Sequence, residues 1–325
     1  MVQDFMFSLQ ATLPVFLVMV VGYVLHQQGF LSKEFCEALD KLVFKVTLPL
    51  MMVVDLAKVD LIHDFDVRYV LFCAIVTTIA FFAIWGLARL LMKDKSMIAE
   101  FVQASYRSSA AILGAAFILN IYGTTGLTSL MIIGAVPLFN IYAVLILTVE
   151  GGAVNQQLSP QEKRVFLRKK MKGALLGILK NPIIDGIAIG ILLSLLPISI
   201  PYIVNKTCSN IASLTSPLAL LSIGATFQGK KAIAKLKPTL FASLSKLLIL
   251  TSIFLPIAIQ MGFREEKLVA LLIMLGSPTT PTCYIMAKNM GHEGVLSSSC
   301  VVMTTLLSSI TLTLWIFIFR SFGYM

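Results

Sequence analysis

Charged residues are scarce in this chain of 325 residues: Asp, Glu, Lys and Arg make up 13%, whereas 58% of the residues are hydrophobic. The mean hydropathy of +0.90 lies well above that of a soluble domain. The composition therefore excludes an ordinary soluble protein and predicts an all-α membrane protein that crosses the bilayer many times. Ten apolar stretches are long enough to cross roughly 30 Å of hydrocarbon, at 8–28, 39–57, 69–92, 101–121, 126–149, 174–196, 203–227, 238–261, 267–288 and 294–319.

Residues that serve metal, redox or hydrolytic chemistry are few as well. The three histidines are isolated near span ends, and the five cysteines show neither CxxC pairing nor metal spacing. HExxH, Walker, Rossmann and GxSxG patterns are all missing. An aspartate pair within the membrane would need Asp55 and Asp185 to meet, and their predicted depths argue against it. We therefore expect no metal site, no cofactor and no enzyme.

Positive charge is unevenly distributed, with a formal net charge of +10. If the N-terminus lies outside, the cytoplasmic loops and flanks hold 18 Lys and Arg residues and the other side holds six. Positive-inside bias then predicts that both termini are extracytoplasmic in a cell membrane. The basic stretch 159–172 is explained in the same way, so nucleic acid is not an expected partner. The first span lacks a basic region before it and a cleavage motif after it, so we expect it to be retained.

An internal repeat appears at a single offset of 168 residues. It superimposes Pro14 on Pro182, Gly22 on Gly190, Ala57 on Ala225, Gly123 on Gly291 and the segment 47–50 on 215–218. Each half holds five spans, an odd number, so the second copy enters the membrane with opposite orientation. We predict a first repeat at 1–150, a cytoplasmic linker at 151–173 and an inverted second repeat at 174–325.

Two prolines interrupt the ninth span in the sequence GSPTTPTCYIMAK at 276–288. Pro278 and Pro281 each remove a backbone donor and clash with the preceding turn, so the helix is predicted to break there. Bare backbone groups inside a bilayer cost several kcal/mol each by order of magnitude, so the break should face a polar interior. The alternative is a simple kink in which the nearby hydroxyls satisfy the freed backbone groups.

Three segments resemble the auxin efflux carrier family: LPVFLVMVVGYVLHQQGFLS at 13–32, SPLALLSIGATF at 216–227 and SPTTPTCYIMAKNMGHEGVLSSSCVVMTTLLS at 277–308. The resemblance covers nearly the whole chain. It implies ten helices in two inverted five-helix repeats, with helices 4 and 9 broken and crossing at the substrate site, as in sodium/proton antiporters and bile-acid symporters. The family includes plant PIN auxin exporters and bacterial carriers of organic acids such as malonate. PIN-type carriers have a proline in the fourth-helix break, whereas this chain has Ser108, Ser109, Ala110 and Gly114 there.

Broken helices expose N-terminal amides, which favour an anionic ligand such as a carboxylate. Arg107 could add a bidentate contact to that ligand or could instead extend to the cytoplasmic interface. Asn140 is an uncharged amide at membrane depth, so we expect it to face the break. The expected substrate-binding residues are Arg107, Ser108, Ser109, Asn140, Ser277, Pro278, Thr279, Thr280, Pro281 and Thr282.

Further polar residues lie within the spans. Lys246 is expected either to pair with a carboxylate or to help attract an anion. Asp55 and Asp185 are further candidates for charge pairing, with ion-pair or interfacial roles. Helix-opening or supporting roles are expected for Thr47, Pro49, Gly114, Thr215, Ser216 and Pro217, and close helix packing for Gly22 and Gly190.

The combined prediction is a secondary transporter of small organic anions, such as malonate or an auxin-like acid, that works by alternating access. Two alternatives stay open: a sodium- or proton-coupled symporter of another small solute, and a channel-like pore built from the same broken helices. The fifth span has no Asp or Glu, which disfavours a sodium/proton antiporter. Expected partners are the organic anion and the lipid bilayer, with Na⁺ or H⁺ coupling and a homodimer left open.

Overall fold

The computed structural model describes residues 2–57, 66–110, 118, 121–122, 126–150, 180–196 and 200–325. These residues form helices and connecting turns, and they contain no strand. The predicted linker at 151–173 and Gly114 lie outside the described residues, as does Gly123.

The described residues of the first half give six α-helices with defined bounds, a π-helical turn (η1) and a 3₁₀ turn (η2). They are α1 (Val2–Gln27), α2 (Lys33–Leu42), η1 (Val43–Thr47), α3 (Leu48–Ala57), α4 (Val67–Leu91), η2 (Lys95–Met97), α5 (Ile98–Tyr106) and α7 (Gly126–Val149).

Residues 180–196 and 200–325 give nine α-helices and one π-helical turn (η3) in the second half. They are α9 (Pro182–Leu195), α10 (Tyr202–Ser213), α11 (Thr215–Ala225), α12 (Gly229–Ala234), α13 (Leu236–Leu244), η3 (Ser245–Ile249), α14 (Leu250–Gln260), α15 (Glu265–Gly276), α16 (Thr282–Asn289) and α17 (Val295–Ser321).

Several of these helical segments are long and apolar enough to cross a bilayer. Five described segments meet that standard: Val67–Leu91, Leu130–Val149, Tyr202–Ala225, Leu236–Gln260 and Val295–Ser321. Shorter apolar helices occur at Thr12–Gln27 and Pro182–Leu195. The protein is therefore a multi-pass helical membrane protein, as the composition predicts.

Local sequence signals explain where several helices begin. The Ser32 side chain accepts a hydrogen bond from Phe35 N at 3.2 Å, and that of Asp66 accepts one from Tyr69 N at 3.1 Å. Asn181 caps α9 through Ile183 N at 2.9 Å, and Pro182 follows it at the first helical position. These caps satisfy orphan N–H groups at positions where the chain enters a helix.

Proline has different consequences in different helices. Pro14, Pro137 and Pro256 lie inside α1, α7 and α14 without ending them. Pro49 and Pro217 lie near the starts of α3 and α11, directly after the π turn η1 and after the interruption at Leu214. The helical hydrogen-bond pattern thus changes near both prolines, and the predicted opening of the second and seventh spans stays a prediction.

Two glycines allow close helix contacts, as predicted. A Cβ on Gly22 of α1 would lie 2.3 Å from the carbonyl oxygen of Leu221 in α11. A Cβ on Gly190 of α9 would lie 2.8 Å from Leu56 Cβ and 3.0 Å from the carbonyl oxygen of Met52 in α3. Neither position has room for a side chain, so these two helix pairs pack with their backbones close together.

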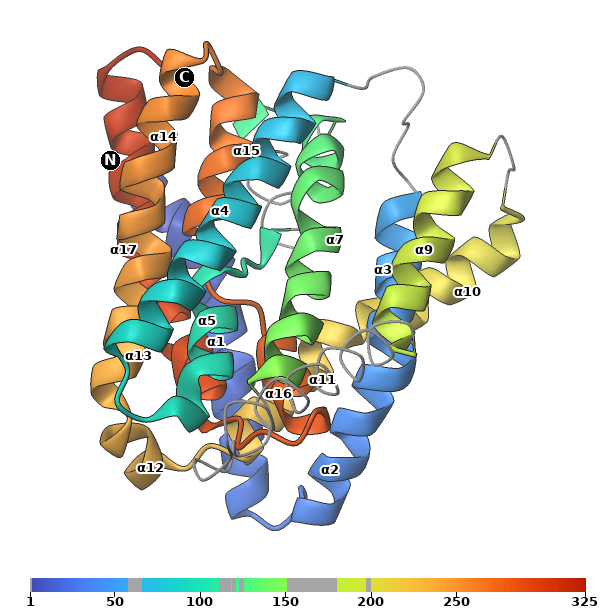
Figure 1. The fold of residues 1–325 in the computed structure, drawn as a ribbon. Coiled ribbons are helices and arrows are strands. Elements are labelled where there is room, and N and C mark those ends of the chain that lie inside the picture. The colour runs from blue at the N-terminus through green and yellow to red at the C-terminus, as the bar shows by residue number, and fades with distance from the viewer. Residues whose placement is uncertain are drawn as a thin grey trace, which may run out of the picture.

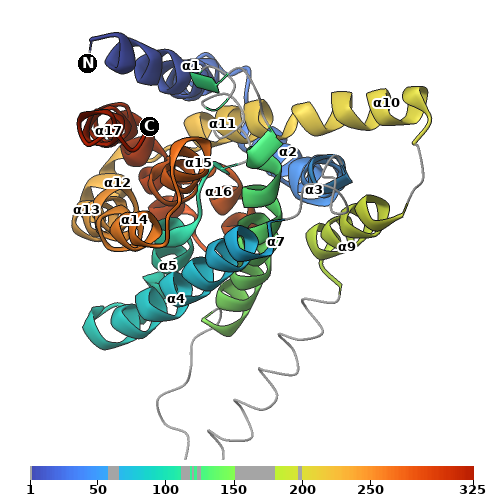
Figure 2. The same cartoon turned by 90° about the horizontal axis from the view of Figure 1, so that it is seen from above.

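The helices surround a central region where several of them are interrupted. α1 packs against α11 and α17, α3 against α9 and α10, and α4 against α7. Figure 1 shows α1 beginning and α17 ending at the same end of the molecule. Seen from above, α15, α16 and α7 lie near the middle, whereas α9 and α10 extend to one side (Figure 2).

Candidate functional site

The first interruption follows α5 directly. Arg107 N donates to Gln103 O at 3.2 Å, and this is the last bond of the helical type before the chain becomes extended at Arg107, with φ −78° and ψ 133°. Residues 107–109 are not helical, and helical geometry returns at Ala110. The break therefore starts one residue before the Ser108-Ser109 pair, although no proline lies there.

The second interruption separates α15 from α16 at the predicted place. The chain leaves the helix at Ser277, which is extended with φ −73° and ψ 162°, and resumes it at Thr282. Thr279 N donates to Thr304 Oγ1 of α17 at 3.0 Å, which gives one freed backbone group a partner inside the protein. The whole segment 277–282 is buried.

The two breaks contact each other directly. Ser109 N donates to Pro278 O at 2.9 Å, and Thr279 Oγ1 donates to Ala104 O at 2.7 Å. The Ser108 hydroxyl also donates to Met274 O. Backbone groups that each helix leaves without partners are therefore satisfied across the two breaks.

Arg107 points into the protein, toward the second break. Its Nη2 donates to Asn140 Oδ1 at 3.0 Å and to Thr282 Oγ1 at 3.1 Å, and its Nη1 donates to Met286 Sδ at 3.0 Å. Only 2% of the residue is exposed. The alternative in which Arg107 extends to the cytoplasmic interface is therefore wrong for this conformation.

The partners of Arg107 are weak for a buried cation. They are an amide oxygen, a hydroxyl and a thioether sulfur, and Arg107 Nε has no partner among the described residues. No ion pair in the described part of the chain includes Arg107. A guanidinium usually binds a carboxylate or phosphate when it is buried, so this positive charge lacks a counter-charge of its own.

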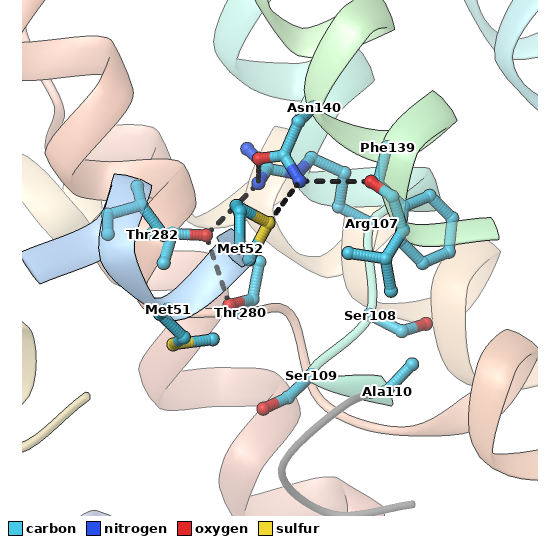
Figure 3. A pocket seen from close by; sticks show the side chains of 12 residues that line it. Met51, Met52, Arg107, Ser108, Ser109, Ala110, Phe139, Asn140, Thr280 and Thr282 are labelled. Atoms are coloured by element: carbon cyan, nitrogen blue, oxygen red, sulfur yellow. Dashed lines mark hydrogen bonds between the residues drawn. The ribbon is translucent and has the colours of Figure 1, made fainter. Parts of the chain in front are cut away.

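A cavity of about 30 Å³ lies beside this guanidinium. Its lining combines Arg107, Asn140 and residues of both breaks with apolar side chains of α3, as Figure 3 shows. The full lining comprises Leu48, Met51, Met52, Arg107, Ser108, Ser109, Ala110, Val136, Phe139, Asn140, Thr280 and Thr282. This volume holds about two water molecules.

Asn140 connects the guanidinium to the surrounding helices. Its Nδ2 donates to Val136 O at 2.9 Å within α7 and contacts Met52 Sδ of α3 at 3.4 Å. Thr280 and Thr282 place their hydroxyl oxygens 3.1 Å apart at the N-terminus of α16. Six of the ten residues predicted to bind substrate line the cavity: Arg107, Ser108, Ser109, Asn140, Thr280 and Thr282. The other four, Ser277, Pro278, Thr279 and Pro281, do not.

Lys246 also contacts the first break. It is fully buried in the π turn η3. Its Nζ donates to Leu275 O at 2.5 Å, to the Ser108 hydroxyl, and to Tyr106 O and Met274 O at 3.4 Å each. Of the two expectations for Lys246, a carboxylate partner is not found among the described residues, where backbone carbonyls and one hydroxyl accept from it, and attraction of an anion stays a prediction.

The two aspartates considered for charge pairing are not part of the cavity lining. Asp185 is exposed in the first turn of α9. Its neighbour Gly186 packs on Pro49, six residues before Asp55 in α3. Six residues of helix span about 9 Å, so Asp185 is not placed directly opposite Asp55 where α9 packs on α3.

The supporting hydroxyls of the second and seventh spans are directed inward. Thr47 and Thr215 are buried, and Ser216 is partly buried. Their hydroxyl oxygens have no hydrogen-bond partner among the described residues. In this conformation they therefore do not satisfy the backbone groups freed at the neighbouring kinks.

Some residues at the site were missed by the sequence reasoning. No sequence pattern marked a methionine as a site residue, yet Met286 contacts the Arg107 guanidinium and Met52 contacts the Asn140 amide through sulfur. Outside the cavity lining, Asp40 was also missed: it is buried and accepts hydrogen bonds from Ser222 at 2.5 Å and Tyr284 at 3.3 Å. The available signal was an acidic residue at the start of the apolar stretch 39–57.

Comparison with known proteins decides the family. A family model described as membrane transport protein matches residues 7–316. The chain belongs to this family, that of the auxin efflux carriers. The resemblance seen in the three sequence segments is thereby confirmed, and the cavity between the breaks belongs to a transporter.

Relatives of this transporter match it along almost their whole length. An "Uncharacterized transporter" of Methanothermobacter thermautotrophicus is 23% identical over 314 residues, which cover 96% of this chain and 98% of the relative. The "Uncharacterized transporter YfdV" of Escherichia coli K12 is 21% identical over 310 residues, which cover 95% and 96%. These printed names agree with membrane transport and state no substrate.

Proposed function

We propose that this transporter is a secondary carrier of small organic anions, whose carboxylate binds Arg107 at the cavity between the two helix breaks. Malonate and auxin-like acids are the substrates to test first. The observation that carries the proposal is the buried guanidinium of Arg107, for which the described residues supply no carboxylate.

The energetics of Arg107 support an anionic ligand. A buried charge without a counter-charge is costly, by several kcal/mol even after relaxation of the protein. A carboxylate could accept from the guanidinium in place of the Met286 thioether, which is a weak acceptor. Thr280 and Thr282, at the N-terminus of α16, add hydroxyl donors and the positive end of a helix dipole.

We further propose the ten-helix fold with two inverted five-helix repeats, at 1–150 and 174–325. One pair of contacts supports this symmetry. Gly22 packs on Leu221, and Gly190 packs beside Val53. Adding 168 converts 22 into 190 and 53 into 221, so one contact maps onto the other. The two breaks, at 107–109 and 277–281, also lie at nearly equivalent positions under this offset.

Alternating access is the mechanism that best suits a cavity of this size. At about 30 Å³ the cavity is smaller than a dicarboxylate, so the substrate needs movement of the α3 side chains away from the breaks. Met51 and Met52 lie at that boundary, and methionine side chains adapt to different packing. We propose that α3 and the broken helices separate on one side of the membrane at a time.

The proposed orientation places both termini outside the cell membrane. Its support is the excess of Lys and Arg in the loops that would then be cytoplasmic, 18 residues against six. α1 begins and α17 ends at the same end of the molecule, as expected if the chain crosses the membrane an even number of times (Figure 1).

A binding experiment on the purified full-length protein tests the substrate class. Malonate and indole-3-acetate are each compared with their neutral amides, malonamide and indole-3-acetamide, by thermal unfolding. We expect at least one acid to raise the unfolding temperature and its amide to leave it unchanged, because a ligand that binds only the folded state stabilises it.

Arg107→Gln provides the decisive variant, since glutamine removes the charge and keeps a polar side chain. A charge-assisted hydrogen bond contributes about 1.5–3 kcal/mol, so affinity for the acid should fall roughly 10- to 150-fold. Arg264→Gln is the matched control, because Arg264 is exposed and lies away from the cavity lining. Equal stabilisation by acid and amide, or an unchanged affinity in Arg107→Gln, would remove Arg107 from the substrate site.

Saturable exchange of internal for external substrate in proteoliposomes separates a carrier from the channel alternative. A carrier should accelerate efflux of labelled substrate when unlabelled substrate is present outside. Flux that rises linearly with concentration and shows no such exchange would favour a pore.

A further inference from the structure

Lys246 is a buried cation whose contacts are not explained by the substrate cavity. It is fully buried and does not line the cavity beside Arg107. No ion pair in the described part of the chain includes it. Its neighbours are oxygen atoms that carry no formal charge.

These oxygen atoms come from the ends of two different half-helices. Tyr106 O is the last carbonyl of α5, whereas Met274 O and Leu275 O belong to the last turn of α15. The last carbonyls of a helix have no intrahelical donor, and they form the negative end of its dipole. Lys246 therefore lies where the C-terminal ends of both broken helices converge.

The Ser108 hydroxyl completes this arrangement. It accepts a hydrogen bond from Lys246 Nζ and donates to Met274 O. Carbonyl and hydroxyl oxygens that converge from unwound helices are the type of ligand set with which carriers of this architecture hold a coupling cation. In this chain the space among these oxygens holds an ammonium group that is covalently part of the protein.

The geometry points to a built-in cation: we propose that the Lys246 ammonium group takes the position of a coupling cation, so that anion binding in this carrier does not require sodium. This inference rests on the proposed function for the identity of the anion. The role proposed for Lys246 is separate from substrate binding. Lys246 is a positioning residue: it contacts Ser108 of the first break and does not itself line the cavity.

The extended backbone of the first break links the two positive charges. At Arg107 the chain is extended, so the neighbouring side chains of Arg107 and Ser108 project in different directions. Arg107 contacts Asn140 and Thr282, whereas Ser108 contacts Lys246. Loss of the ammonium group should therefore disturb the position of Arg107 without removing any contact that Arg107 itself makes.

The test compares cations on the purified full-length protein. Thermal unfolding of the wild type, Lys246→Ala and Lys246→Met is measured in chloride salts of sodium, lithium, potassium and N-methyl-D-glucamine at equal ionic strength. A further series adds propylammonium, which carries the three carbons and the ammonium group that the alanine substitution removes.

We expect the wild-type unfolding temperature to be the same in all salts. Lys246→Ala should unfold at a lower temperature in N-methyl-D-glucamine, and sodium or propylammonium should raise that temperature saturably. Lys246→Met is the matched control: its side chain fills the space, so it should be destabilised and should not respond to either cation.

Two results would overturn the inference. One is a saturable, sodium-specific stabilisation of the wild type, which would place a cation site elsewhere. The other is a Lys246→Ala protein that gains nothing from sodium or propylammonium, including one that yields no folded protein in any of these media.

Malonate affinity provides the readout that separates this inference from the proposed function. The wild-type affinity should be equal in sodium and in N-methyl-D-glucamine, whereas that of Lys246→Ala should depend on the cation. A wild-type requirement for sodium would count against the built-in cation. If malonate binds in no medium, the choice of substrate fails, and the unfolding temperatures still decide the role of Lys246.

Discussion

The two helix breaks differ in what causes them. Between α15 and α16 the chain contains Pro278 and Pro281, which remove two backbone donors within four residues, whereas the single prolines inside α1, α7 and α14 do not end those helices. After α5 the break contains Arg107, Ser108 and Ser109, none of which prevents a helix. One break is encoded locally, whereas the other depends on its surroundings.

The contacts between the breaks explain the difference. Ser109 N donates to Pro278 O, and Thr279 Oγ1 donates to Ala104 O. The Lys246 ammonium group donates to the last carbonyl of α5 and to the Ser108 hydroxyl. Partners outside the helix thus replace the helical bonds of the first break, and most of these partners exist only because the second break is open. The proline-containing second break therefore stabilises the open conformation of the first break.

The largest expected effect comes from closing the second break. In Pro278→Ala/Pro281→Ala the segment can continue as a helix, so Pro278 O and Thr279 are no longer available to the first break. We expect malonate uptake into proteoliposomes to be abolished, while the protein still inserts into the membrane and elutes as a single species in size exclusion.

Pro256→Ala is the control for this double variant. Pro256 is exposed inside α14, which continues through it. Its replacement should leave uptake close to that of the wild type. Wild-type uptake by the double proline variant would contradict the dependence of the first break on the second.

A smaller effect is expected from the serines of the two breaks. Ser108→Ala removes a hydrogen-bond partner of the buried Lys246, which should cost about 1–3 kcal/mol. Ser277→Ala removes a buried hydroxyl that has no partner among the described residues, so stability should be unchanged or slightly higher. Thermal unfolding measures both variants. A larger loss of stability in Ser277→Ala than in Ser108→Ala would contradict the claim that the first break depends more than the second on surrounding residues.

The smallest effect concerns the end of α15 that lies away from its break. Lys267 Nζ lies 2.6 Å from Asp66 Oδ2, and about a third of each side chain is exposed. Asp66→Asn should therefore cost only about 0.2–1 kcal/mol in the free energy of unfolding. Thermal unfolding at low and high salt measures this cost, which should shrink as salt screens the pair. A loss of several kcal/mol in the free energy of unfolding would show that the Lys267–Asp66 ion pair stabilises α15 more than a partly exposed ion pair is expected to.

The same ion pair has a defined pH dependence. The hydrogen bond from Lys267 lowers the pKa of Asp66 below its ordinary value. The contribution to stability is thus fully present above the ordinary carboxylate pKa of about 4 and is lost as the pH falls through the lower folded-state pKa. A difference between wild type and Asp66→Asn that grows as the pH falls below 4 would contradict this sign.

Local sequence signals predicted the elements that depend on neighbouring residues in the chain. The break at 277–281 was predictable because proline acts on its own backbone and on the preceding turn. The close contacts of Gly22 and Gly190 were predictable from the repeat, since both glycines occupy equivalent positions. Asn140 was found because an amide at membrane depth needs a polar partner.

Other features could not be found in this way. The sequence left the direction of Arg107 open, because a long side chain near a helix end can extend either outward or inward. The partners of Lys246 are backbone carbonyls, which every residue possesses and which no sequence pattern marks. Met52 and Met286 were missed because a thioether accepts hydrogen bonds only weakly, so a methionine rarely indicates a polar contact.

The sequence by itself determined that this chain is a multi-pass membrane protein with a proline-broken ninth apolar stretch, because hydropathy and proline act through local chemistry. Only the tertiary structure decided that a second break opens without proline and that Arg107 turns inward. It also decided that Lys246 lies among the ends of two helices. These outcomes depend on hydrogen bonds between separate helices, some of them joining residues more than 100 positions apart, and such partners become neighbours only when the helices pack.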